Sequence, residues 1–173
     1  LMMKRSVITL FAMLAAVSCS KTESYSTFST RNRVFFCYEI FQSPFNQVTT
    51  PARFLSVRKS EGKLHMVDSD GRKYDMELSA VQNSSFLMGL AGLIIGTPTF
   101  NNDGMSVWAY DLGCPECNNP SIRLKFNLEG TASCSECEKS WSLNSSGFPV
   151  SGKARPLYRY PVTLNNGVLT VSN

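Results

Sequence analysis

Two C-x-x-C pairs constrain this chain more than any other feature of its sequence. Cys114 and Cys117 form the first pair, Cys134 and Cys137 form the second, and residues 118–133 separate them. A C-x-x-C turn directs both sulfurs to the same side, so two such turns can close a tetrahedral thiolate cage. The spacer falls within the window of about 15 to 20 residues that is typical of four-cysteine zinc sites. The sequence therefore predicts one metal site built from all four cysteines.

The four cysteines leave three interpretations open. A structural zinc is favoured, and because four thiolates fill its coordination sphere, no position remains for water or substrate. The second interpretation is an electron-transfer centre, in which the same thiolates hold one iron or an all-cysteine [2Fe-2S] cluster. The third is a pair of disulfides without any metal, which an exported chain allows.

Residues 1–18 have the composition of a bacterial lipoprotein signal peptide. Lys4 and Arg5 form a positive start, residues 7–17 form an apolar stretch too short to span a bilayer, and small residues precede Cys19. We expect Cys19 to carry lipid and to anchor the chain to a membrane without spanning it. The alternative is ordinary secretory cleavage a few residues earlier, which would leave Cys19 as a free thiol.

This leader also predicts a location and bears on the metal. A lipidated Cys19 places the chain in a bacterial cell envelope, on a periplasmic or surface face, with another envelope protein as a candidate partner. The leader contains no Arg-Arg pair, so we expect export of an unfolded chain through the general secretory route. An iron–sulfur cluster assembled in the cytoplasm would not survive that passage, whereas zinc can be acquired afterwards.

The rest of the chain suits one folded domain. Residues 19–31 are rich in Ser and Thr, as in a flexible tether. Residues 32–173 then form a single β domain, with a metal-binding subdomain at about residues 110–150. The chain has 17 basic and 13 acidic residues, and two of the basic ones lie in the leader. This small, scattered excess gives no support to nucleic-acid binding.

Apolar alternation and turn sequences predict an all-β fold. The expected strands are residues 34–41, 54–58, 63–67, 73–78, 86–96, 107–112, 122–128, 141–143, 157–164 and 168–171. We expect residues 34–41 to be buried on both faces, with Cys37 as a small buried hydrophobe. Residues 86–96 contain three glycines, which disfavour a helix, and are expected to form one buried strand.

The order of motifs from residue 110 to the end matches a known fold family. The matching segments are residues 110–115, the second cysteine pair, 141–143, Gly147, 151–152, Ala154, 156–157, 160–162 and 168–169. This order resembles the Rieske family, and with the leader the chain is similar to Rieske-like lipoproteins of the Bacteroides group. The resemblance implies stacked antiparallel sheets with two metal-binding knuckle loops at one tip.

The ligands depart from the Rieske pattern. A Rieske cluster has two histidines on its outer iron, whereas Cys117 and Cys137 stand at those positions here. The resemblance also implies four residues around the metal, namely Lys139, Ser140, Trp141 and Lys153. Lysine occupies position 139, where the family commonly has a serine, and position 153, where it has a proline. These changes favour a zinc knuckle over a tuned redox cluster.

Enzyme chemistry has little support in the sequence. His65 is the only histidine and falls within an expected strand, so no Ser/His/Asp set can be assembled around it. No glycine-rich phosphate loop is present. Both cysteine pairs precede strands rather than helices, which argues against a thioredoxin-type thiol. We therefore expect a binding or interaction module and no catalytic residues.

Overall fold

The computed structural model describes residues 28–100 and 107–173. The expected signal peptide, Cys19 and residues 19–27 of the expected tether lie outside these ranges. Within them, strands dominate, with one short α-helix, α1 (Ala80–Ser85), and one 3-10 helix, η1 (Phe45–Thr49). Neither helix of the described ranges has the length and apolar character that crossing a membrane requires.

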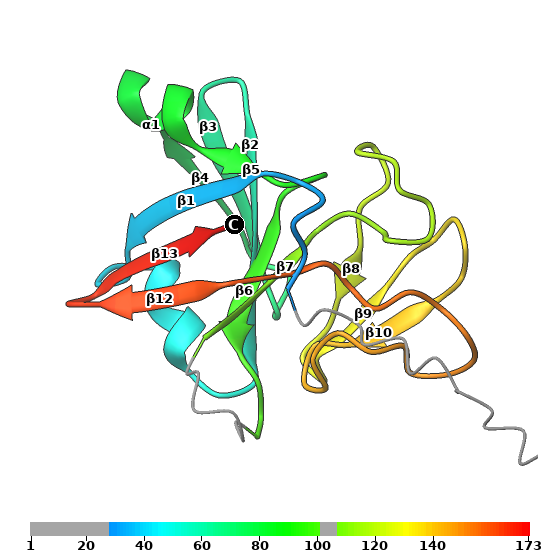
Figure 1. Cartoon of the computed structure of the whole chain (residues 1–173). Coiled ribbons are helices and arrows are strands. Elements are labelled where there is room, and N and C mark those ends of the chain that lie inside the picture. The colour runs from blue at the N-terminus through cyan, green and yellow to red at the C-terminus, as the bar shows by residue number, and fades with distance from the viewer. Residues whose placement is uncertain (1–27, 101–106) are drawn as a thin grey trace, which may run out of the picture.

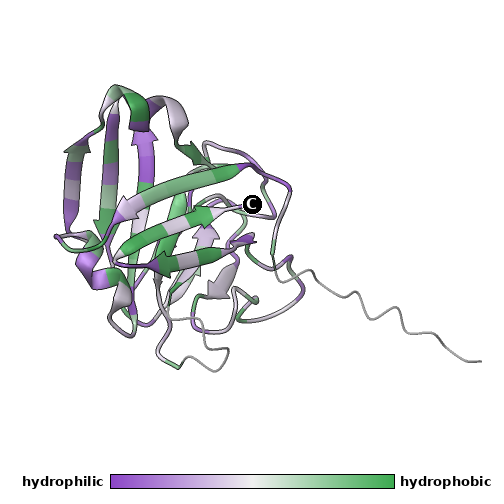
Figure 2. Cartoon of the chain, turned by 60° about the vertical axis from the view of Figure 1, so that its left-hand side comes forward, coloured by the Kyte–Doolittle hydropathy of each residue, from purple (hydrophilic) through white to green (hydrophobic). Residues whose placement is uncertain are grey.

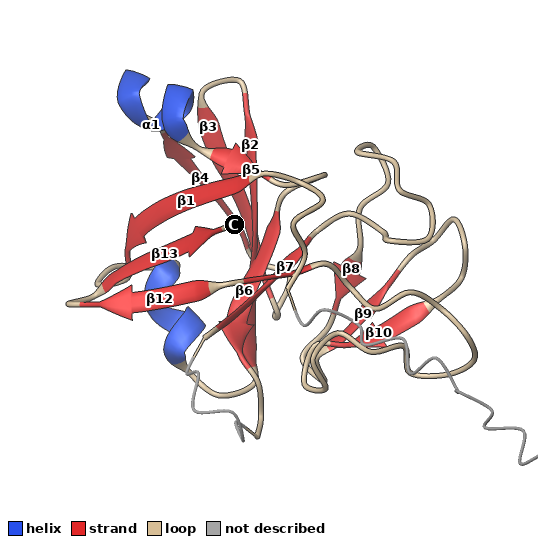
Figure 3. Cartoon of the chain, in the orientation of Figure 1, coloured by secondary structure: helices blue, strands red, loops and turns tan. Residues whose placement is uncertain are grey.

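Three antiparallel sheets build the fold (Figures 1 and 3). The first has the order β12 (Val162–Asn165), β13 (Val168–Ser172), β1 (Val34–Glu39) and β5 (Leu87–Met88). The second has the order β11 (Arg159–Tyr160), β7 (Trp108–Asp111), β6 (Leu93–Thr97), β2 (Arg53–Ser60), β3 (Lys63–Asp68) and β4 (Lys73–Glu77). The third has the order β10 (Ser140–Ser142), β9 (Thr131–Ser133) and β8 (Lys125–Phe126). The predicted all-β class of antiparallel sheets is confirmed.

The six-stranded sheet lies between the other two sheets (Figure 1). Successive side chains of a strand point to opposite faces, and Figure 2 shows the resulting alternation of hydrophobic and hydrophilic residues. In β2, Leu55 and Val57 join a core that also contains Val171 of the four-stranded sheet. Phe54 belongs to a second core, together with Trp141 of the three-stranded sheet. The second core also contains Cys114 and Cys134, and Cys117 and Cys137 pack against it, so the cysteine loops rest on the central sheet.

The first strand differs from its expected burial. β1 ends at Glu39, and only one of its faces is buried, because the four-stranded sheet has the rest of the protein on one side only. Phe36 is fully buried, whereas Phe35 is 42% exposed. Cys37 is half-buried, and its Sγ accepts a hydrogen bond from the Thr170 hydroxyl at 3.6 Å.

Two expected strands are each divided. Residues 86–96 form β5 and β6, because the chain turns between Gly89 and Gly92, which both have positive φ (69° and 126°). Residues 157–164 divide at Pro161 into β11, which pairs with β7, and β12, which pairs with β13. Pro161 therefore marks the point where the chain leaves the six-stranded sheet for the four-stranded one.

The N-terminal end of the described chain contacts the domain. The Ser29 N–H donates to the Arg159 carbonyl oxygen at 2.7 Å. The Arg159 guanidinium lies over the Phe28 ring, 5.3 Å from its centroid. Residues 28–31 of the expected tether thus include two residues that lie against β11.

Candidate metal centre

Two loops of the same shape carry the four cysteines. The first follows β7 and the second follows β9. In the first, the Asn118 N–H donates to the Cys114 carbonyl at 2.9 Å, and in the second the Glu138 N–H donates to the Cys134 carbonyl at 3.1 Å. Asn118 and Glu138 both have positive φ, 47° and 57°. This repeated turn presents both sulfurs of each pair on one side of the loop.

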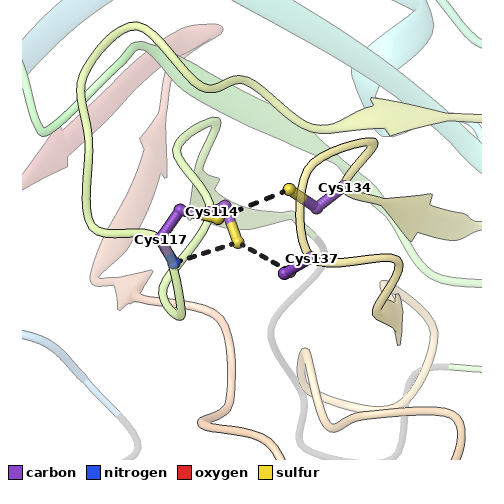
Figure 4. Close-up of side chains that lie close together, drawn as sticks. All are labelled: Cys114, Cys117, Cys134 and Cys137. Atoms are coloured by element: carbon purple, nitrogen blue, oxygen red, sulfur yellow. Dashed lines mark hydrogen bonds between the residues drawn. The ribbon is translucent and has the colours of Figure 1, made fainter.

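The two loops bring their four sulfurs together (Figure 4). All four Sγ atoms lie within 4.8 Å of one another. The Cys114 and Cys137 sulfurs are 3.6 Å apart, and those of Cys117 and Cys134 are 3.8 Å apart. A tetrahedron with metal–sulfur bonds of about 2.3 Å has sulfur–sulfur edges of about 3.8 Å. Two of the six sulfur–sulfur edges therefore have about the length of such a tetrahedron, and the four cysteines together could bind a metal ion.

These four cysteines form no disulfide. A disulfide places its sulfurs about 2.0 Å apart, and each of the four is a free cysteine. Both short sulfur contacts join one loop to the other rather than the two cysteines of one pair. The sulfurs are arranged as the corners of one cage, so the structure does not have the two disulfides of the third interpretation.

The surroundings of the sulfurs suit a cation. Burial raises the pKa of the Cys114 and Cys117 thiols, because a lone thiolate is poorly solvated there. Burial acts in the same direction at Cys134, but the N–H groups of Cys137 and Glu136 donate to its sulfur and hold its pKa below the usual value. A bound cation would stabilise all four thiolates at once and displace their protons.

The expected surroundings of the metal include Lys139 and Ser140. The Lys139 carbonyl accepts the Cys134 N–H at 3.0 Å, which fixes the start of the second loop. Its ammonium group donates to the Lys153 carbonyl at 3.5 Å. Ser140 begins β10, and its carbonyl accepts the Val150 N–H at 2.9 Å. Backbone groups of both residues therefore hold the second cysteine loop and the segment at residues 149–156.

Trp141 and Lys153 are the other two residues expected around the metal. The Trp141 ring is fully buried in the core that contains the cysteines, and its Nε1–H donates to the Arg155 carbonyl at 2.8 Å. Lys153 is exposed, and its carbonyl accepts a hydrogen bond from Lys139 Nζ. Trp141 thus packs in the core beside the cysteines, whereas Lys153 contacts Lys139 through its backbone carbonyl.

Glu116 is a site residue that the sequence did not identify. Its Oε2 accepts from Lys139 Nζ at 2.8 Å, and its Oε1 accepts the Arg155 N–H at 2.7 Å. The hydrogen bond from Lys139 holds the Glu116 pKa below its usual value. Glu116 lies between the cysteines of the first pair, so one carboxylate joins both cysteine loops to the segment at 149–156. An acidic residue in one pair and a lysine beside the other was the available signal.

Asp111 is a second residue that the sequence did not identify. Its carboxylate is fully buried and accepts from the Gly113 N–H at 2.7 Å, the Leu90 N–H at 2.6 Å and the Tyr160 hydroxyl at 2.6 Å. Burial raises its pKa, although these donors oppose the rise. Asp111 fixes Gly113, which directly precedes Cys114, and so orients the first cysteine loop.

His65 and Cys37 lie outside the cluster. His65 is in β3, and its Nδ1 is 2.8 Å from the Asp75 carboxylate. Cys37 is in β1 and contacts Thr170. Within residues 28–100 and 107–173, the four clustered cysteines are the one group of His, Cys, Asp or Glu side chains with the proximity that a metal site requires.

No family model, no curated protein and no solved structure matches this chain. The resemblance to Rieske-like lipoproteins therefore stays a prediction. What the molecule shares with that expectation is its class, three antiparallel sheets, and a cluster of four cysteines carried by two loops. The role of the site is inferred from this geometry.

Proposed function

We propose that the four cysteines bind one structural zinc ion in an envelope-anchored interaction module. The observation that carries this proposal is the convergence of four sulfurs from two loops, with edges of 3.6 and 3.8 Å between loops. Cys114, Cys117, Cys134 and Cys137 would hold the ion. Four thiolates leave no open coordination position, so the zinc would supply a crosslink between the loops rather than a reactive water.

A single ion fits the cage better than a two-iron cluster. In an all-cysteine [2Fe-2S] centre each iron takes two thiolates, and bridging sulfides separate the irons. Thiolates on different irons must then lie farther apart than thiolates on the same iron. All four sulfurs here lie within 4.8 Å of one another, which favours one ion at their centre.

The expected export of the chain before it binds metal favours zinc over a single iron. Four thiolates accept either metal, so ligand type alone does not choose between them. An exported chain would acquire its metal after folding begins outside the cytoplasm, which zinc permits. Structural sites with four protein ligands are also the usual form of zinc in proteins.

The envelope anchor is the second part of the proposal. A lipid on Cys19 would hold the domain at a membrane surface, and the domain would then present its surface to an envelope partner. The positive start, the apolar stretch and the small residues before Cys19 support this assignment.

Metal retention by two cysteine variants tests the structural role. Cys137→Ser removes one ligand, whereas Cys37→Ser changes a half-buried cysteine of β1 outside the cluster. Structural zinc contributes about 10 to 16 kcal/mol in small zinc peptides, as much as the roughly 5 to 15 kcal/mol that stabilises a whole domain. We expect Cys137→Ser or a strong chelator to lower the melting temperature, and Cys37→Ser to retain the metal. An unchanged melting curve in chelator, with two disulfides found by mass spectrometry, would reject the proposal.

Electron transfer is the second candidate function. It is favoured by the fit of the same cage to one iron, because iron also binds four thiolates in a tetrahedron. The test is the visible spectrum of the purified protein before and after dithionite. A coloured protein that dithionite bleaches would place electron transfer first.

A further inference from the structure

A groove of about 590 Å³ lies beside the three-stranded sheet. Residues of β2, β3 and β4 form one wall, and residues 123–126, from the connection between the cysteine pairs, form the other. Its volume lies within the range of about 300 to 1,000 Å³ that is typical of small-ligand sites. None of the four clustered cysteines lines it, so the groove is separate from the metal centre.

Strand register produces the first wall. Residues directly opposite in paired strands share a face of the sheet. Two such rows run across β2, β3 and β4, namely Arg58, His65 and Asp75, and Ser56, Val67 and Lys73. In β2, Ser56 and Arg58 follow Phe54 at spacings of two, so these rows lie on the face that carries Phe54. Phe54 packs against the cysteine loops. The two rows lie on the same face of the sheet, outside the area that these loops cover, so their polar side chains line the groove.

Alternation along residues 123–126 produces the second wall. Leu124 is buried, and its N–H donates to the Leu112 carbonyl at 2.8 Å, which fixes this segment to the end of β7. Arg123 and Lys125 flank Leu124 and are exposed. Two basic side chains therefore stand at the groove opposite those of the sheet.

The charges of the groove are not balanced within the described residues. Four cations line it and take part in none of the ion pairs of residues 28–100 and 107–173, namely Arg58, Lys73, Arg123 and Lys125. Two carboxylates, Asp68 and Asp75, also line the groove, so the cations outnumber the carboxylates four to two. Asp75 lies 2.8 Å from His65, and Asp68 accepts from the Tyr74 hydroxyl at 2.9 Å.

We propose that this groove binds an organic anion. Leu112, Leu124 and Phe126 line it and would contact an apolar body. A carboxylate, sulfonate or phosphate group would lie among the four cations, where charge-assisted hydrogen bonds are strong and geometrically specific. The proposal goes beyond the zinc site and does not depend on which metal the cysteines bind.

Two fluorescent probes that differ in one charged group test the proposal on the full chain. 8-Anilinonaphthalene-1-sulfonate has an aromatic body and a sulfonate, and N-phenyl-1-naphthylamine has a closely similar body without the charge. We expect the sulfonate to bind about tenfold more tightly at low salt, as one charge-assisted interaction provides. We also expect added salt to weaken its binding, because these cations face solvent. Equal binding of the two probes would overturn the proposal.

Charge-removing variants locate the binding. Lys73→Gln and Arg123→Gln take one cation from each wall, and each is expected to weaken binding of the sulfonate probe about tenfold. Lys63→Gln is the control, because Lys63 lies at the start of β3 and does not line the groove. This variant loses the same charge and should bind the sulfonate probe as the wild type does. Melting curves check that each variant is folded, and Lys125→Gln replaces any variant that is not. If the groove variants bind like Lys63→Gln, the proposal is wrong.

The same samples distinguish this proposal from the zinc proposal. Zinc content is measured on every preparation used for the titrations. Anion binding in a protein that contains no zinc would contradict the proposed metal and leave the groove assignment intact. A protein with one zinc per chain and no preference for the sulfonate would contradict the groove assignment and leave the proposed metal intact.

Discussion

Lys139 Nζ lies 2.8 Å from Glu116 Oε2 and joins the two cysteine loops outside the sulfur cage. Glu116 belongs to the first pair, and Lys139 follows the second. The other oxygen of Glu116 accepts the Arg155 N–H at 2.7 Å, which brings in the segment at 149–156. The loops are therefore held in register by a carboxylate as well as by whatever the sulfurs bind. This second connection has a testable dependence on pH.

Glu116→Gln should lower the melting temperature at neutral pH. Because Lys139 holds the Glu116 pKa below its usual value, the ionised carboxylate stabilises the fold at pH values above its unfolded pKa of about 4.3. That contribution is lost as the pH falls through the lower folded pKa. Melting curves of the two proteins should therefore differ at pH 7 and approach one another as the pH falls below about 4.

The matched control for Glu116 is Glu136→Gln. Glu136 occupies the same position in the second pair and is exposed, so its substitution should leave the melting temperature unchanged at both pH values. A difference between wild type and Glu116→Gln that stays constant from pH 7 to pH 3 would show that the ionised pair does not hold the loops.

Asp111→Asn should weaken metal binding without removing a ligand. The carboxylate accepts N–H groups from Leu90 and Gly113, and an amide has one acceptor oxygen where the carboxylate has two. Groups that orient a metal-binding loop typically change affinity by about 10- to 100-fold when removed. A competition titration with a zinc chelator measures this loss. Tyr160→Phe, which removes one donor to Asp111, should have a smaller effect, and equal affinity of Asp111→Asn and wild type would contradict the assignment.

Cys19→Ala should release the protein from membranes. If Cys19 carries lipid, its thioether is what holds the chain at the bilayer, and the variant should move to the soluble fraction. Fractionation after a salt wash measures this, because salt removes proteins held by charge alone. Cys37→Ser serves as a control for the loss of a thiol and should remain with the membranes. A Cys19→Ala protein that stays in the membrane fraction rules out lipidation as the anchor.

The cysteine cluster was predictable because its geometry is local. A C-x-x-C turn fixes two sulfurs within four residues, and the spacer of residues 118–133 returns the chain to form the second pair beside the first. The connection made by Asp111 was not predictable, since it depends on partners far along the chain, whereas that made by Glu116 had the acidic residue and the lysine beside the cysteines as its signal. Asp111, for example, meets Leu90, which is 21 residues away.

Most strands were predicted, but β9 was not, and strand limits and burial were predicted less well. Residues 86–96 read as one apolar strand, but the N–H groups of Leu90 and Ala91 donate to Asp111 and close a turn inside that range. The helix α1 has a local signal in the sequence. Ser79 and Gln82 form a capping box at its start, in which each side chain bonds the other residue's N–H.

Metal content is the measurement that tests the central claim most directly. The full chain is purified without added metal, and its zinc and iron are quantified by mass spectrometry together with the visible spectrum. We expect about one zinc per chain and a colourless protein, because zinc in four thiolates has no redox chemistry and no visible absorption. Stoichiometric iron with visible absorption that dithionite removes would contradict the claim.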